Sequence, residues 1–120
     1  MFYSISSGTL YDICGDPIGR GYSGYGLCRN QPNKVSVKNR GPIPPGLYFF
    51  QKPFDSDKTG PLTIQLVPLS DNIMYGRDGF SIHGDLLNNP GLGSHGCIIM
   101  SHDVRVVLAD SLDECLCVFP

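Results

Sequence analysis

Apolar and polar residues alternate along several short segments of the chain. Residues 62–66 alternate with a period of two, and residues 80–83 follow the same pattern. This period is typical of a β-strand that buries one face. In the second segment Phe80 and Ile82 share one face, so His83 falls on the other. We therefore expect two half-buried strands, the second of which presents a histidine on the face opposite its apolar residues.

Short apolar or aromatic runs separated by turn-forming residues predict further β-structure elsewhere. Three prolines between Gly41 and Gly46 exclude both a helix and a central strand there, because proline fixes φ and has no N–H to donate. The expected elements are a β-hairpin within residues 1–13, a long ordered loop over 14–40 with a short strand at 34–38, an extended turn at 41–46, a strand at 47–51 and a closing strand at 115–119.

One helix is predicted, over residues 102–110. Ser101 is a suitable N-cap, and Asp103 favours the first helical turn. Apolar residues then recur at helical spacing on one face. These residues are Val104, Val107, Leu108 and Leu112.

The composition limits the size and class of the fold. The chain has 120 residues, the length of a single domain spanning 1–120, and its 15 Gly and 10 Pro disfavour long helices. Together with the strand pattern, this predicts a mostly β domain, a mixed β-sandwich or open barrel, with one short helix late in the chain. No internal repeat or low-complexity segment interrupts it.

The charge pattern excludes several classes of partner. A net charge of −2 and a pI near 5.8 give no basic face for nucleic acid. No 18-residue apolar run predicts membrane insertion, and the first residues lack the basic and apolar regions of a signal peptide. We therefore expect neither nucleic acid nor a membrane as a partner, and synthesis in the cytoplasm without a cleavable signal.

The most informative chemistry lies between Ser81 and Met100. A thiol becomes an effective nucleophile when a histidine within hydrogen-bond reach takes its proton, and His83 with Cys97 supplies such a pair. Gly96 allows a tight turn before the cysteine, of the kind that aims backbone N–H groups at an oxyanion. The turn-forming residues between the pair predict a loop that returns to its starting edge.

These motifs resemble the YkuD-type L,D-transpeptidases, cysteine enzymes that act on the stem peptides of bacterial peptidoglycan. The shared pattern is Ile-His-Gly at 82–84 followed by Ser-His-Gly-Cys at 94–97. The resemblance is closer to the subgroup of type VI secretion effectors, the Tlde1-domain effectors, and covers most of the chain. The segments that carry this closer resemblance are residues 22–24, 41–48, 76–80, 82–85 and 96–100.

The resemblance implies a role for each matching residue. Cys97 would be the nucleophile and His83 the general base, oriented by the carbonyl of Gly84, with Gly96 forming the turn at the nucleophile. Residues near this pair are candidates for substrate contact, although each also has a structural interpretation such as a loop cap or a solvated turn residue. These candidates are Ser94, His95, Arg77, Tyr75 and Asp85.

Two departures separate the chain from housekeeping members of that family. Ile99 stands where those enzymes usually carry an arginine, and only 13 residues separate His83 from Cys97. Both differences favour the effector subgroup. The missing arginine also keeps open a non-catalytic module that binds stem peptides, and a phage or housekeeping wall enzyme is a further alternative.

The resemblance also implies partners and a place of action. The substrate would be a peptidoglycan stem peptide, acylated onto the thiol with no cofactor. Release by water, a free D-amino acid or a second stem would give L,D-carboxypeptidase, exchange or transpeptidase products. An antibacterial effector would leave the cytoplasm, through type VI secretion components, and act in the periplasm of target bacteria. Its producer would need a periplasmic immunity protein.

The remaining cysteines and histidines suggest two alternatives. Five cysteines leave at least one free thiol, for which Cys97 is the candidate. Cys14 and Cys28 could bridge in an oxidising compartment, whereas Cys115 and Cys117, two apart in a strand, cannot comfortably bridge each other; otherwise all four would be small buried hydrophobic residues. A zinc site is the other alternative, but its ligands lack the paired spacing of such sites, and we expect no metal. Its ligands would be His83, His95, Cys97 and His102.

Overall fold

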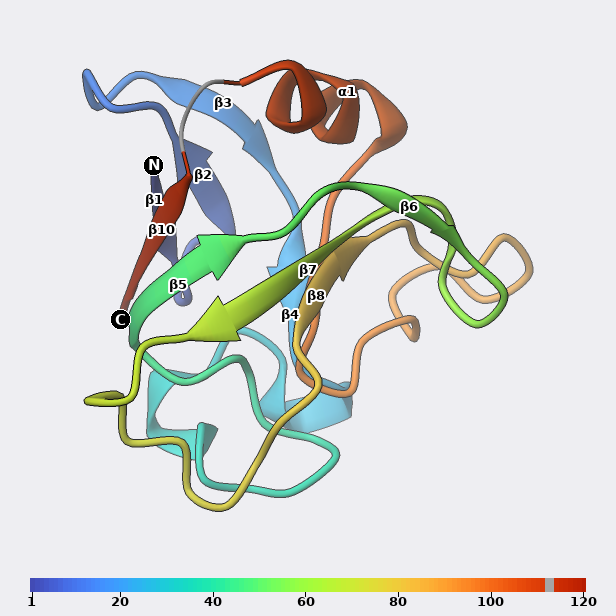
Figure 1. Ribbon diagram of the computed structural model, residues 1–120. Coiled ribbons are helices and arrows are strands. Elements are labelled where there is room, and N and C mark those ends of the chain that lie inside the picture. Colours follow the sequence, from blue (N-terminus) through green and yellow to red (C-terminus); the bar gives the residue numbers. More distant parts are fainter. Residues whose placement is uncertain (112–113) are drawn as a thin grey trace.

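A computed structural model describes residues 1–111 and 114–120. Ten strands in these residues form one curled, mixed sheet (Figure 1). Its order is β3-β2-β1-β10-β5-β7-β8-β9-β4, and β6 pairs with β7 beside this path. The mixed sheet and the one short helix after Cys97 confirm the mostly β fold class.

The strands are short, except for β7. They are β1 (Phe2–Ser4), β2 (Thr9–Tyr11), β3 (Pro17–Arg20), β4 (Tyr22–Ser23), β5 (Gly46–Phe50), β6 (Phe54–Ser56), β7 (Gly60–Pro68), β8 (Ser81–His83), β9 (Ile98–Ile99) and β10 (Cys115–Phe119). Two 3₁₀ turns, η1 (Gly26–Cys28) and η2 (Pro32–Lys34), precede the proline-rich segment, and α1 spans His102–Asp110.

Most of the expected elements are present. The N-terminal hairpin, the extended segment before β5, the strands β5, β7 and β8, the helix and the closing strand are all confirmed. The strand expected at 34–38 is wrong. That segment forms turns after η2, and the Val35 carbonyl accepts a hydrogen bond from Arg77 instead of pairing in a ladder.

The inner face of the sheet forms the hydrophobic core. Neighbouring strands place buried residues in register, as in the row that joins Tyr3 and Val118 and the row that joins Leu116 and Tyr48. A parallel row joins Ile82 of β8 with Ile98 of β9, and both side chains are fully buried. The core thus fixes the positions of β8 and β9, which carry the candidate site.

The helix packs through a narrower face than its apolar pattern predicts. The Ser101 hydroxyl caps it by accepting from the Val104 N–H at 3.3 Å. Val104 and Leu108 pack against the core, but Val107 is 49% exposed, and Leu112 lies outside the described residues. In the part of the chain that the structure describes, no helix has the length and apolar character needed to cross a membrane.

Candidate active site

Cys97 and His83 meet because β8 and β9 pair in parallel. Ile82 lies opposite Ile98, so alternation along the strands places Ser81, His83 and Cys97 together on the outer face. The thiol and the imidazole are hydrogen-bonded to each other. The alternation of residues 80–83 is therefore confirmed, since Phe80 and Ile82 enter the core and His83 does not.

The backbone fixes the tautomer of His83. Its Nδ1 lies 2.8 Å from the Gly84 carbonyl oxygen, which can only accept, so Nδ1 carries the proton. The other ring nitrogen, Nε2, is then left to face the thiol. With only 6% of its surface exposed, the imidazole is held in this orientation. Gly84 suits this position because a Cβ there would lie 2.8 Å from the Arg105 guanidinium.

The environment favours the ion pair of thiolate and imidazolium. Burial opposes ionisation of Cys97, but hydrogen bonds from His83 and Ser81 outweigh it and lower the pKa of the thiol. Burial likewise opposes the charge on His83, but the hydrogen bond and charge of Cys97, with the Gly84 carbonyl, raise the pKa of the imidazole. A thiolate paired in this way is the nucleophilic form of cysteine.

Ser81 is a site residue that the sequence interpretation missed. Its hydroxyl donates to the Cys97 sulfur at 3.5 Å, and its backbone N–H also lowers the pKa of that thiol. The signal was present in the sequence, because Ser81 lies two residues before His83 and therefore on the same face of β8.

Ser94 shapes the turn that precedes the nucleophile. It is fully buried, its hydroxyl donates to the Cys97 carbonyl at 2.5 Å, and it accepts from the N–H groups of Gly24 and Gly96 at 2.9 and 3.1 Å. A substrate cannot reach this hydroxyl, so the expectation of a direct substrate contact is corrected. Its other interpretation, a residue that tunes the turn, agrees with these bonds.

Gly96 is required for close packing at the nucleophile. Its φ is +139°, and a Cβ would lie 2.6 Å from the Arg77 guanidinium and 2.8 Å from the Phe80 ring. Because its N–H already donates to Ser94, Gly96 contributes its conformation and not a free donor for an oxyanion. The N–H groups that we expected to face an oxyanion at this turn therefore do not include the N–H of Gly96.

Arg77 lies beneath the turn and lines the cavity beside the thiol. It is 8% exposed, and its guanidinium donates to four backbone carbonyls and lies 5.1 Å from the centre of the Phe80 ring. Its two terminal nitrogens are held by the backbone, so Arg77 is not a solvated turn residue, and its role in substrate binding stays a prediction. The four carbonyls belong to Val35, Gly41, Pro42 and His95, at 2.5, 2.8, 2.7 and 3.3 Å.

Asp85 closes the loop between the histidine and the cysteine. It accepts from the Tyr22 hydroxyl at 2.6 Å and from the N–H groups of Leu86 and Gly91, both at 2.8 Å. Burial alone would raise its pKa, but these donors outweigh burial, and the pKa lies below its ordinary value. Of its two interpretations, the loop cap agrees with these contacts.

His95 and Tyr75 lie at and beyond the rim of the site. The His95 ring is exposed, stacks on Tyr25 with ring centres 4.9 Å apart, and its Nδ1 hydrogen-bonds to the Asn39 carbonyl at 2.9 Å. It can therefore contact a bound ligand. Tyr75 is 47% exposed and does not line the cavity beside the thiol.

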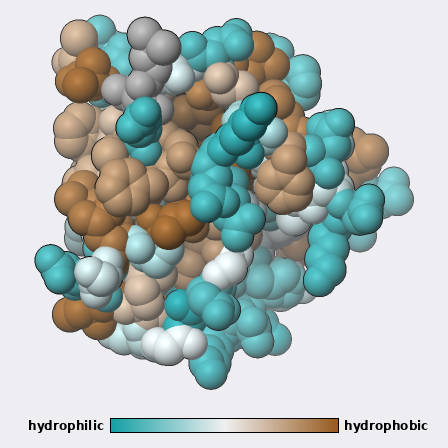
Figure 2. All heavy atoms as spheres, in the orientation of Figure 1, coloured by the Kyte–Doolittle hydropathy of each residue, from teal (hydrophilic) through white to brown (hydrophobic). Residues whose placement is uncertain are grey.

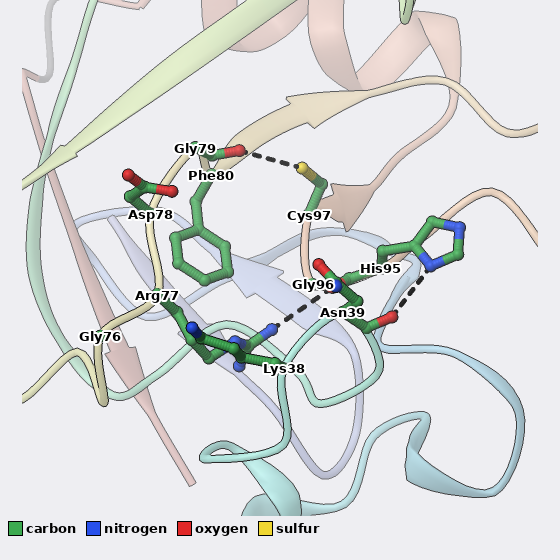
Figure 3. Close-up of a pocket in the computed structure, with 10 residues that line it drawn as sticks. All are labelled: Lys38, Asn39, Gly76, Arg77, Asp78, Gly79, Phe80, His95, Gly96 and Cys97. Carbon is green, nitrogen blue, oxygen red and sulfur yellow. Dashed lines mark hydrogen bonds between the residues drawn. The ribbon is translucent and has the colours of Figure 1, made fainter.

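One cavity is lined by the thiol, and a second adjoins it. One, of about 360 Å³, is lined by Cys97, Phe80 and His95, together with Lys38, Asn39 and Asp78, which the sequence interpretation missed (Figure 3). The other, of about 380 Å³, lies between β6, β7 and β8 and is lined by Ser81 and other hydroxyl-bearing residues. Gly79 and Phe80 line both cavities, and the Gly79 carbonyl lies 3.7 Å from the Cys97 sulfur.

The other candidate chemistry is not assembled in one place. Within residues 1–111 and 114–120, no three His, Cys, Asp or Glu side chains are grouped so that they could hold a metal ion. All five cysteines are free in this structure. Cys14 and Cys115 are exposed and Cys28 and Cys117 half-buried, so none of these four is the buried hydrophobic residue that was one alternative.

A thiol beside an imidazole that a backbone carbonyl orients, with a cavity at the thiol, is the arrangement that cysteine acyl transfer requires. The family model of the Tlde1 domain matches residues 18–113, and the chain belongs to this family of type VI secretion effectors related to L,D-transpeptidases. No curated protein and no solved structure matches the chain.

Proposed function

We propose that this protein is a cysteine enzyme that cleaves the tetrapeptide stems of peptidoglycan through a thioester on Cys97. The observation that carries the proposal is the hydrogen-bonded pair of Cys97 and His83, with both pKa values shifted toward the ion pair. Membership of a family related to L,D-transpeptidases supports the choice of substrate.

In the first half-reaction, the Cys97 thiolate attacks the carbonyl that joins the L-centre of diaminopimelate to the terminal D-alanine. The tetrahedral intermediate collapses when the C–N bond breaks, and the His83 imidazolium gives its proton to the departing amine. D-Alanine leaves with its amine restored, and the diaminopimelate acyl group stays on the sulfur as a thioester.

In the second half-reaction, an acceptor attacks the thioester while neutral His83 removes the acceptor's proton. The C–S bond breaks, and the thiolate and imidazolium return together. Water as the acceptor gives carboxypeptidase trimming, a D-amino acid gives exchange, and a second stem gives a crosslink. The two cavities that share Gly79 and Phe80 support this scheme, because they offer separate space for the acyl chain and for the acceptor.

The chemical test uses tetrapeptide muropeptides and mass spectrometry. We expect the wild-type protein to release D-alanine, and Cys97→Ala and His83→Ala to lose this activity by about a thousand-fold or more. Cys28→Ala is the matched control, since this free thiol lies away from the site and does not line either cavity. Turnover that survives in Cys97→Ala would overturn the mechanism, and saturable binding without any change in mass would establish a non-catalytic binding module instead.

The biological part of the proposal is an antibacterial effector that acts in the periplasm of target cells, where stem peptides are exposed. Expression in bacteria with an attached export signal should cause swelling or lysis that requires both His83 and Cys97. A periplasmic immunity protein from the producer should suppress it. Equal toxicity without the export signal, or no effect after export, would contradict a wall target.

A further inference from the structure

The outer side of the sheet carries an apolar surface away from the candidate site. In antiparallel sheets the side turned to solvent is usually polar. Here the outward residues of β1, β10, β5 and β7 are mostly apolar, and Figure 2 shows the corresponding brown area on the side of the molecule where Figure 1 places these strands. We call this surface the apolar face. Its large members, between 37% and 71% exposed, are Phe2, Ile13, Leu47, Phe49, Val67 and Phe119.

The strand register makes the apolar face continuous. Phe2 lies opposite Cys117, which in turn lies opposite Leu47. One row further along, Cys115 lies opposite Phe49, and Phe49 lies opposite Val67. Side chains directly opposite each other on one side of a sheet are in contact distance. The exposed residues therefore form one surface across four strands, unlike the scattered exposed leucines of the loops.

The face has relief and little charge. Phe2 stands between two hollows, one of about 420 Å³ lined by Ile13, Leu47 and the two cysteines, and one of about 300 Å³ lined by Tyr11 and Phe119. Glu114 is the only Asp, Glu, Lys, Arg or His among the residues that line the two hollows. Depletion of charge and enrichment of aromatic residues mark the core of an interface.

The size of the face suits an interface between two protein chains. Its six large residues expose on the order of 500 Å², taking about 150–250 Å² for each aromatic side chain. A standard interface buries about 800 Å² on each partner, and a polar rim commonly supplies the difference. The face is thus larger than single exposed side chains require, and it supplies about 60% of what each partner of a standard interface buries.

We propose that the apolar face pairs with the same face of a second copy of this chain. A two-fold contact brings each residue near its own counterpart, so an excess of one charge would repel itself. The charged groups among the residues that line the two hollows are Glu114 and the terminal amino group of Met1, which are opposite in sign. Phe2 stands between the two hollows, so the face offers both a projecting side chain and recesses that a second copy can fill. Homodimer interfaces are also the more apolar kind.

The proposal is independent of the proposed enzymatic function. The site lies on β8 and β9, beyond β7 in the sheet order. Several members of the face, among them Phe2, Ile13 and Phe119, lie outside residues 18–113, which the family model matches. The face therefore extends beyond the matched residues, and failure of either proposal leaves the other standing.

The first test measures the mass of the protein in solution by sedimentation. We expect a reversible dimer within about 1 µM to about 1 mM, the range for an interface of modest size. Leu47→Lys should weaken the dimer at least about ten-fold, because it buries an unpaired charge. Leu27→Lys is the matched control, since Leu27 is 98% exposed outside the face, and it should change the dissociation constant less than about two-fold. Circular dichroism checks that both variants are folded, and Phe49→Lys gives a second disruption on the same strand.

The second test uses the free thiols of the face. In a Cys97→Ala background, which removes the candidate nucleophile, a short bis-maleimide should crosslink two chains through Cys115 or Cys117. The double variant Cys115→Ser, Cys117→Ser should lose this product, and Cys28→Ser should keep it. A wild-type chain that stays monomeric over the whole concentration range would overturn the proposal, as would a dimer that Leu47→Lys and Phe49→Lys leave unchanged.

Discussion

Replacing Arg77 by methionine should cost much of the stability of the fold. Arg77 is 8% exposed, and its guanidinium donates to four backbone carbonyls, three of them at 2.8 Å or less. Each buried carbonyl left without a donor costs about 1–3 kcal/mol, less where water enters. We therefore expect Arg77→Met to lose about 3–5 kcal/mol of unfolding free energy.

Two further variants make this expectation specific. Arg77→Lys keeps the charge but not the planar fork, so it should lose roughly half as much. Arg20→Met is the matched control, because the exposed Arg20 side chain donates to the Ser7 carbonyl at 2.8 Å from a solvated position, and its loss should cost less than about 1 kcal/mol.

Urea unfolding with a common m-value measures the differences in stability. Alkylation of Cys97 against pH, measured on folded Arg77→Lys, reports whether the turn still holds the thiol against His83. The reasoning would be refuted if Arg77→Met unfolded within about 1 kcal/mol of the wild type, since the four carbonyls would then have no need of the guanidinium.

The remaining predictions concern the site. Because the pKa of Cys97 is lowered, the wild-type thiol should alkylate at pH values below the usual midpoint of about 8.5, and an ordinary midpoint would contradict the ion pair. His83→Ala should move that midpoint upward, and Ser81→Ala should move it in the same direction by less; no movement in either variant would remove that residue from the thiol's environment. The rate of acyl transfer should fall below the pKa of Cys97, as the thiolate is protonated, and above the raised pKa of His83, as the leaving amine loses its acid; a flat profile would count against both roles. Gly96→Ala should cost about 2–4 kcal/mol and abolish activity through its clash, whereas Gly26→Ala, which meets nothing within 4 Å, should cost only about 1–2 kcal/mol; similar losses would contradict the packing argument.

Local patterns determine the elements that could be predicted from the sequence. The helix has the expected bounds because its cap, Ser101, acts on a residue only three positions away. The closing strand also has the expected bounds. In contrast, β3 and β4 are edge strands of two to four residues, held by distant contacts such as that between Gly21 and the Ile99 carbonyl, where a Cβ would lie 1.7 Å away. No local pattern contains that information.

The candidate site likewise contains residues that the local sequence predicts and residues that it does not. Cys97 and His83 could be chosen from residue type and spacing, and Ser81 could have been added from strand alternation alone. The burial of Arg77 could not, because its carbonyl partners lie 18 to 42 residues away in sequence. A turn arginine in solvent and a buried arginine that holds three segments together have the same local sequence.

The position of β10 separates the order of synthesis from the order of assembly. Of the ten strands in the described residues, β10 comes last in sequence, yet it lies in the interior of the sheet between β1 and β5. The amino group of Met1 donates to the Cys115 carbonyl, 114 residues away, at 3.1 Å. Contacts of such long range make folding slow, and the sheet cannot close before β10 has left the ribosome. The nascent chain therefore carries Cys97 and His83 before the surrounding sheet is complete.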